Sequence, residues 1–247
     1  MKVLFEPSGK PQSSIYISYC VARRERTYAE AVRHIINTTT ESIDFGVFSR
    51  NSAKLMVASK MTRRGPFQGL RIIHGQAHDP QAILSRVWDA IGEPMVELKH
   101  RLLHAAGRNR SRMLVEIQEP LVGRIAADLW KMFKRMLPLF MGVNTVGLTA
   151  ASKVLSSVFP EIALPVEKAQ WREIFQTVDY TDIIMSMRAE ISEWEIRSQK
   201  KLNHCDPLGG LTLPAFYNAV VMEEAAGGPR NDVQAMRPKV SSCFGRT

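Results

Sequence analysis

The chain has 247 residues, of which 45% are hydrophobic and 23% charged, an ordinary composition for a globular protein with a sizeable buried core. No apolar run reaches the roughly 18 residues of a membrane-spanning helix, and the first residues, MKVLFEPSGKPQSS, lack the apolar stretch of a secretory signal. The three cysteines, Cys20, Cys205 and Cys243, are odd in number and far apart, which argues against a disulfide framework and favours a reducing, intracellular compartment.

The excess positive charge lies entirely in the first half of the chain. The formal net charge is +9, and residues 1–115 carry 18 Lys and Arg against 9 Asp and Glu, whereas residues 116–247 carry 15 of each. An uneven basic charge of this size favours a polyanionic partner, most simply nucleic acid. A well-solvated basic surface with no such partner is the alternative, and composition alone does not choose between them.

In the first half, the pattern predicts a mixture of short helices and strands. SSIYISYCVA (13–22) is rich in β-branched and aromatic residues and predicts a strand, and Thr27 is typical of the start of a helix reaching Thr38. NSAKLMVASKM predicts a short helix, RRGPFQG a loop and LRII a short strand. From residue 79 the apolar positions follow helical spacing, with a break expected at 92–94; they are Ile83, Val87, Ile91, Met95, Leu98, Leu102 and Leu103. The basic stretch AAGRNRSR (105–112) is the predicted domain boundary.

The second half has stronger helical patterns. MLVEI (113–117) fits a strand or the start of a helix, and residues 121–137 predict an amphipathic helix that Pro138 ends. Further helices are expected over 149–158, from Pro165 through PVEKAQWREIF, from Thr181 to about Trp194, and over 211–226 with Pro214 in its first turn. Residues 227–247 predict a flexible tail.

One stretch in the second half, NTVGLTAASKVL (144–155), combines a glycine with the start of a helix. Gly147 permits a close backbone approach, and the first N–H groups of a helix, together with its dipole, form an anion site. Small residues at 150–152 allow close helix packing, and Lys153 is placed one turn further along for a phosphate contact. A plain turn between two helices is the alternative. If the stretch binds a nucleic-acid backbone, a bulky residue at 147 such as valine is expected to weaken binding to all sequences alike while leaving the fold intact.

This stretch resembles the helix-hairpin-helix DNA glycosylase superfamily. The family motif is roughly Pro-Gly-Val-Gly-x-x-x-Ala, and residues 144–150 resemble it with Asn144 in place of the proline and Thr145 in place of the first glycine. The apolar-Val-Asp segment that opens the next helix corresponds to Pro165-Val166-Glu167, eighteen residues after Thr149. The resemblance covers residues 121–175. It places Thr149 where the lyase subgroup has its catalytic lysine and Glu167 where the family has its catalytic aspartate. Because a threonine cannot form a Schiff base, lyase activity is not expected.

The resemblance therefore implies a mainly α protein with a helix-hairpin-helix core and a basic, mixed α/β N-terminal region. The expected parts are a basic region (1–112), a helical helix-hairpin-helix domain (113–226) and the tail (227–247). Its expected function is DNA binding, with or without monofunctional N-glycosylase activity that removes a damaged or modified base. The rival is a non-catalytic nucleic-acid-binding or protein-interaction domain.

The same resemblance implies the site residues. Glu167 would activate water or stabilise positive charge developing on the sugar. The phosphate backbone of DNA would be bound by Thr145, Val146, Gly147, Thr149, Ala150, Ser152 and Lys153. No cofactor is expected, nor a metal, because the histidine pairs His74/His78 and His100/His104 lack an accompanying ligand motif. The expected location is cytoplasmic or nucleoid-associated, without membrane contact.

Overall fold

The protein, described here from a computed structural model, is mainly α-helical, as predicted. The structure describes residues 2–23, 26–39, 42–105, 109–206 and 209–226; the expected tail, 227–247, lies outside them. Within these ranges there are ten α-helices and one small antiparallel hairpin, formed by β1 (Arg71–Ile73) and β2 (Gln76–His78). The short strand predicted for LRII is thus confirmed as β1.

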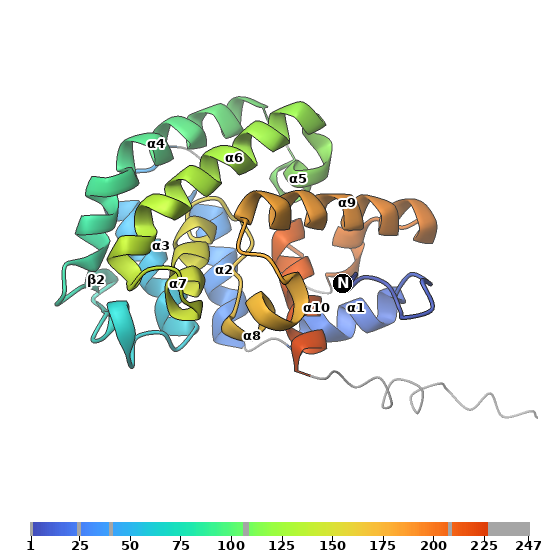
Figure 1. Cartoon of the computed structure of the whole chain (residues 1–247), viewed down its shortest axis with the longest axis horizontal. Helices are drawn as coiled ribbons and strands as arrows, with labels where there is room; N and C mark the ends of the chain where they lie inside the picture. Colours follow the sequence, from blue (N-terminus) through green and yellow to red (C-terminus); the bar gives the residue numbers. More distant parts are fainter. Residues whose placement is uncertain (1, 24–25, 40–41, 106–108, 207–208, 227–247) are drawn as a thin grey trace, which may run out of the picture.

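The helices pack in two neighbouring groups joined across the middle of the molecule (Figure 1). The hairpin lies with α3 (Phe45–Ala58), α4 (Ile83–Ala105), α6 (Glu119–Met136) and α7 (Thr145–Ser156), whereas α1 (Ser14–Ala22), α9 (Tyr180–Ser198) and α10 (Leu213–Ala225) form the other group. α2 (Arg26–Thr38) packs on α3, α5 (Met113–Glu116) packs on α9 and α10, and α8 (Lys168–Gln170) contacts both α7 and α10. The groups are linked where α6 packs on α9.

The first predicted element is wrong, because residues 14–22 form the helix α1 and not a strand. Ser13 caps this helix by accepting a hydrogen bond from Tyr16 N, and the helix packs on α10. Its buried side chains recur at helical spacing and are Tyr16, Ile17, Cys20 and Val21. Burial against α10 therefore outweighs the weak strand preference of the β-branched residues.

Two predicted helices also differ in their continuity. The break expected at 92–94 does not form: α4 runs through Pro94, and its buried stripe continues on both sides of that residue. Conversely, the helix expected from Pro165 consists of only three α-helical residues, α8, followed by a π-helical turn at Trp171–Phe175. The helices predicted near 27–38, 121–137, 181–194 and 211–226 are confirmed as α2, α6, α9 and α10.

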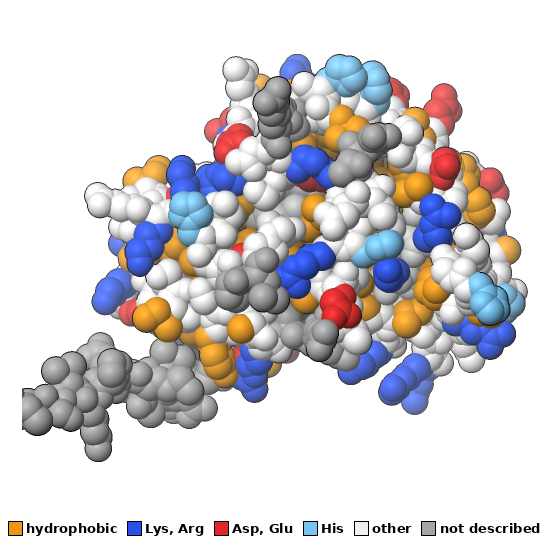
Figure 2. Space-filling model, turned by 180° about the vertical axis from the view of Figure 1, so that it is seen from behind, with side chains coloured by type: hydrophobic (Ala, Val, Ile, Leu, Met, Phe, Trp, Pro, Cys, Tyr) orange, Lys and Arg blue, Asp and Glu red, His pale blue; other side chains and the backbone are white. Residues whose placement is uncertain are grey.

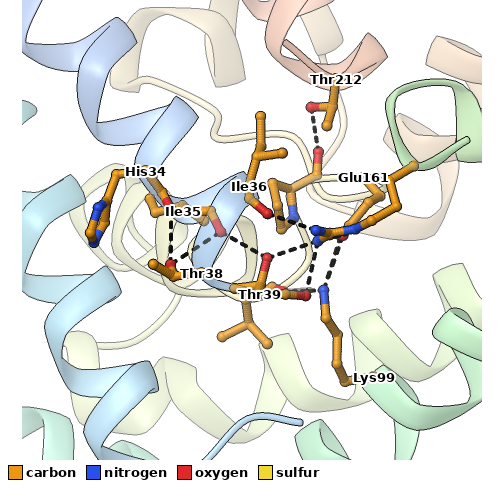
Figure 3. A network of polar contacts seen from close by, with 11 residues as sticks. His34, Ile35, Ile36, Thr38, Thr39, Lys99, Glu161 and Thr212 are labelled. Atoms are coloured by element: carbon orange, nitrogen blue, oxygen red, sulfur yellow. Dashed lines mark hydrogen bonds and ion pairs between the residues drawn. The ribbon is translucent and has the colours of Figure 1, made fainter. Parts of the chain in front are cut away.

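The buried apolar side chains form one core that runs from Val3 to Val221 and takes residues from both sides of position 112. A buried ionic network also joins residues on both sides of position 112 (Figure 3). The ammonium of Lys99 lies 3.1 Å from a carboxylate oxygen of Glu161, and both side chains are 1% exposed. Arg110 donates to the same carboxylate and to the carbonyl oxygens of Ile36 and Thr39. Arg110 and Arg112, at the predicted boundary, therefore join elements of both halves through buried or half-buried contacts.

Candidate nucleic-acid interface

The turn between α6 and α7 is tied together by its own hydrogen bonds. After the 3-10 turn Leu137–Phe140, Met141 and Gly142 adopt left-handed φ angles of 71° and 83°. The Asn144 amide oxygen accepts from the backbone N–H groups of Val146 and Gly147, both at 2.9 Å, and its amide nitrogen donates to Met141 O at 2.8 Å. One side chain thus caps α7 and closes the turn.

Gly147 is required by a close backbone approach. A Cβ atom at this position would lie 2.2 Å from Gly142 O and 2.7 Å from Phe140 O. Both oxygens belong to the backbone, so they cannot swing aside as a flexible side chain does. The expectation that a bulky residue at 147 leaves the fold intact is therefore wrong, because α7 would have to move away from the turn.

The tip of this turn is apolar and exposed, with a pair of arginines beside it. The exposed fractions are 68% for Met141, 70% for Val143 and 38% for Val146. A side-chain atom of Val146 lies 3.6 Å from where a Cβ would stand on Gly65, which directly follows the exposed Arg63-Arg64 pair. Neither arginine forms an ion pair with an acidic residue in the part of the chain that the structure describes. The sequence carries no local signal of this juxtaposition, because the two segments are far apart along the chain.

The predicted phosphate-binding residues divide into two groups. Thr145 and Val146 reach the surface at the start of α7, and the buried Gly147 gives the turn its shape. The others are buried, with 5% exposure for Thr149 and none for Ala150, Ser152 and Lys153. In this structure Ala150, Ser152 and Lys153 present no surface to a phosphate, and Thr149 presents very little.

The buried residues of α7 instead contact the segment that precedes α8. Ser152 Oγ accepts a hydrogen bond from Val166 N at 3.0 Å. The Lys153 ammonium lies 2.5 Å from a carboxylate oxygen of Glu167. Lys153, predicted to bind phosphate, and Glu167, predicted to be catalytic, therefore form an ion pair with each other.

Glu167 occupies the N-cap position of α8, and a chain of polar contacts fixes that helix start. Gln170 Oε1 accepts from Glu167 N at 2.8 Å, and Gln170 Nε2 donates to Asn218 of α10 at 3.3 Å. Asn218 in turn donates to the hydroxyl of Tyr28 in α2 at 3.2 Å. The Glu167 side chain keeps 29% of its surface exposed. The site therefore holds a positioned carboxylate that water can reach, beside a fully buried cation.

One more polar group lies on the same face of α7. Thr149 precedes Lys153 by four residues, so their side chains are neighbours along the helix. The Thr149 hydroxyl is buried and has no hydrogen-bond partner within the described residues. An unpaired buried hydroxyl is costly, which makes this the one predicted site residue whose local environment does not account for its polarity.

Ion pairs within the molecule use much of the basic charge of the first half. Among the residues that the structure describes, seven Lys or Arg side chains of the first half pair with acidic side chains of the second half: Lys2, Arg23, Arg33, Lys99, Arg101, Arg110 and Arg112. On the face opposite to that of Figure 1, Lys and Arg side chains are spread over the surface with Asp and Glu among them (Figure 2). Part of the excess positive charge of the first half therefore serves contacts with the second half of the chain, while the net charge of +9 remains.

The described residues contain no group of three or more His, Cys, Asp and Glu side chains placed to hold a metal ion. The rings of His100 and His104 stack 4.1 Å apart on α4, and His74 and His78 belong to the hairpin region. None of the described helices is long and apolar enough to cross a membrane. No protein-family model, curated protein or solved structure matches this chain.

Proposed function

We propose that this protein binds DNA through the turn 141–147, with Arg63 and Arg64 contacting phosphates on either side of it. The observation that carries the proposal is the position of this arginine pair, exposed and without an acidic partner among the described residues, next to the tightly built start of α7. By contrast, Lys99, Arg110 and Arg112 are already held by acidic side chains within the fold. Unpaired arginines are suited to a phosphate backbone because their planar donors form two hydrogen bonds at once.

In this proposal the enzymatic step, base removal, depends on Glu167. A base flipped out of the stack would lie against the exposed part of this carboxylate, which then activates water or stabilises positive charge on the sugar as the glycosidic bond breaks. Lys153 serves this carboxylate and makes no phosphate contact. Thr149 offers no amine, so the product would be an abasic site with an unbroken strand.

The non-catalytic alternative is favoured by a specific observation. Ion pairs between the two halves give several cations of the first half, Lys99, Arg110 and Arg112 among them, a role inside the fold that needs no external partner. A helical domain that binds DNA weakly, or that binds another protein, is consistent with those pairs. Catalysis and binding therefore need separate tests.

Binding is tested by its dependence on salt. The affinity for duplex DNA is expected to fall at least about tenfold between roughly 50 and 200 mM salt, as several phosphate contacts are lost. Replacing Arg63 and Arg64 with alanine should reduce the salt slope by nearly 2, about 0.9 for each lost contact. The control removes the same charge from two exposed positions elsewhere, Lys10 and Arg124. Binding that ignores salt, or equal effects of both double variants, would refute the proposed surface.

Catalysis is tested by incubating the protein with DNA that carries different damaged bases and measuring abasic sites. Glu167→Gln should abolish base release and spare DNA binding, because the proposed catalytic role of this charge is in the transition state and its other partner is Lys153, not DNA. Lys153→Met/Glu167→Gln serves as the folded control, since it removes the charge pair as a unit. If the parent releases no base from any lesion, the non-catalytic alternative stands.

A further inference from the structure

Three basic side chains come together on α2 and α3, away from the turn 141–147. His34 belongs to α2, whereas Arg50 and Lys54 lie one turn apart on α3, and all three are partly exposed. Figure 3 shows the imidazole of His34 pointing away from the buried network around Glu161. None of the three forms an ion pair with an acidic side chain in the part of the chain that the structure describes. This basic cluster therefore belongs neither to the buried network nor to the turn.

Contacts between the two helices hold the basic cluster together. α2 packs on α3, and the Thr38 hydroxyl of α2 donates to the side-chain oxygen of Asn51 in α3 at 3.0 Å. His34 and Lys54 each lie about one turn from this contact, on α2 and α3 respectively. Burial lowers the pKa of His34, and the positive charges of Lys54 and Arg50 lower it further. The imidazole is therefore largely neutral near neutral pH, since its ordinary pKa is about 6.5.

The charged residues around the basic cluster do not cancel its positive charge. Asp44 begins α3, where its carboxylate accepts a backbone N–H of that helix at 2.7 Å, and it pairs with no cation among the described residues. Arg33, next to His34 in the sequence, is held 3.6 Å from Asp206. The remaining acidic group on this helix is Glu30, which is exposed one turn before His34. An anion entering the cluster would thus relieve the repulsion between its cations.

We propose that His34, Arg50 and Lys54 bind the phosphate dianion of a phosphomonoester or of free phosphate. Such a group carries a charge of about −1.5 to −2 at pH 7 and has three terminal oxygens, one for each basic side chain. A backbone phosphodiester has only one negative charge and two such oxygens, so it would leave one donor unused. The bound dianion favours the charged imidazole, and binding is therefore coupled to uptake of a proton by His34. This site does not depend on the proposed DNA binding by the turn.

The site is tested by titrating the protein with inorganic phosphate while the imidazole signals are followed by nuclear magnetic resonance. Phosphate should shift the His34 signal saturably and raise the pKa of this imidazole. Arg50→Gln/Lys54→Gln should weaken phosphate binding at least about tenfold, because it removes two charge-assisted hydrogen bonds. Binding of phosphate to His34→Gln should resemble that of the parent at about pH 8. The affinity of the parent relative to this variant should rise as the pH falls to about 6, and titration of phosphate itself cancels in that ratio.

The matched control is Lys131→Gln/Arg135→Gln, which removes the same two residue types, also four apart, from an exposed face of α6. It should bind phosphate as the parent does. Equal weakening in both double variants would show that net charge alone is measured, and together with an unsaturable shift or an unchanged pKa of His34 it would overturn the proposal; either of the last two would suffice alone.

Oligonucleotides identify the source of the phosphate. Tighter binding of a 5′-phosphorylated oligonucleotide than of inorganic phosphate would support the proposal and assign the site to the end of a nucleic acid. Equal affinities would support it and assign the site to free phosphate or a small phosphomonoester. If the same oligonucleotide ending in a hydroxyl shifts the His34 signal equally, the basic cluster binds the phosphodiester backbone and the proposal is overturned.

Discussion

Lys153 and Glu167 form an ion pair, and substituting one of them should change the free energy of unfolding by a different amount than substituting the other. Lys153 is completely buried, whereas the carboxylate of Glu167 is 29% exposed. Removing the carboxylate leaves an ammonium in the interior with its strongest partner gone, whereas removing the ammonium leaves a carboxylate that water can still hydrate. The two single substitutions are therefore not equivalent.

Glu167→Gln is expected to lower the free energy of unfolding by about 3 kcal/mol, the low end of the range for breaking a buried pair, because the amide oxygen still faces the ammonium. For a chain of this size that corresponds to a fall of roughly 6–12 °C in the unfolding midpoint. Lys153→Met should cost much less. Lys153→Met/Glu167→Gln should recover most of the loss, since replacing both charges of a buried pair is often neutral.

The assay is urea unfolding followed by far-ultraviolet circular dichroism, with Glu173→Gln as the control. Glu173 is exposed and forms no ion pair in the described structure, so its substitution should change the free energy by no more than about 0.5 kcal/mol. The reasoning fails if Glu167→Gln is as stable as this control, or if the double variant is no more stable than the single one. It would then follow that Lys153 is hydrated and that α7 does not bury it.

Three further outcomes are expected. Gly147→Ala should destabilise by about 1–3 kcal/mol, as overpacking does, and should weaken DNA binding, measured by urea unfolding and by titration; an unchanged midpoint would contradict the close approach to Gly142 O. Arg110→Ala should cost about 3 kcal/mol in the same unfolding assay, because it leaves part of the charge of buried Glu161 uncompensated; a loss as small as that of Glu173→Gln would argue against the network. Burial raises the pKa of Glu190, which accepts hydrogen bonds from Leu4 N and from the Tyr217 hydroxyl. Because the folded state holds this proton more tightly than the unfolded state, the stability should fall as pH rises from about 4.3 through the raised pKa. Glu190→Gln should remove that fall, as measured by thermal unfolding at a series of pH values.

The helical class and most helices could be predicted because their signals are local. In α4 and α6, apolar residues recur at helical spacing over many turns, and this pattern indicates a helix without any knowledge of the tertiary contacts. The segment 14–22 could not be predicted, because its β-branched residues favour a strand in isolation and only the packing on α10 makes it a helix. The short length of α8 could not be predicted for a related reason. Its start is fixed by contacts with Asn218 and Ser152, which lie on other helices.

The candidate site shows the same division. The sequence predicts Gly147 as a turn residue and pairs Glu167 with the stretch before it, since both follow from motif spacing. It does not reveal that Lys153 is buried, because a lysine on a helix is normally solvated. Nor does it place Arg63 beside the turn, since that contact depends on the tertiary packing of two distant segments.

The ion pairs between the two halves also determine the order in which the chain can complete its fold as it is synthesised. Glu161, Glu190, Glu195 and Glu223, which neutralise or anchor residues of the first half, are all made late. Until they emerge, the first 115 residues, with 18 Lys and Arg against 9 Asp and Glu, form a cationic segment that lacks these later acidic partners. Such a segment attracts polyanions such as ribosomal RNA. The N-terminal segment can pack against α9 and α10 only after these last helices have been made. Synthesis of the C-terminal third is therefore needed before the fold can be completed.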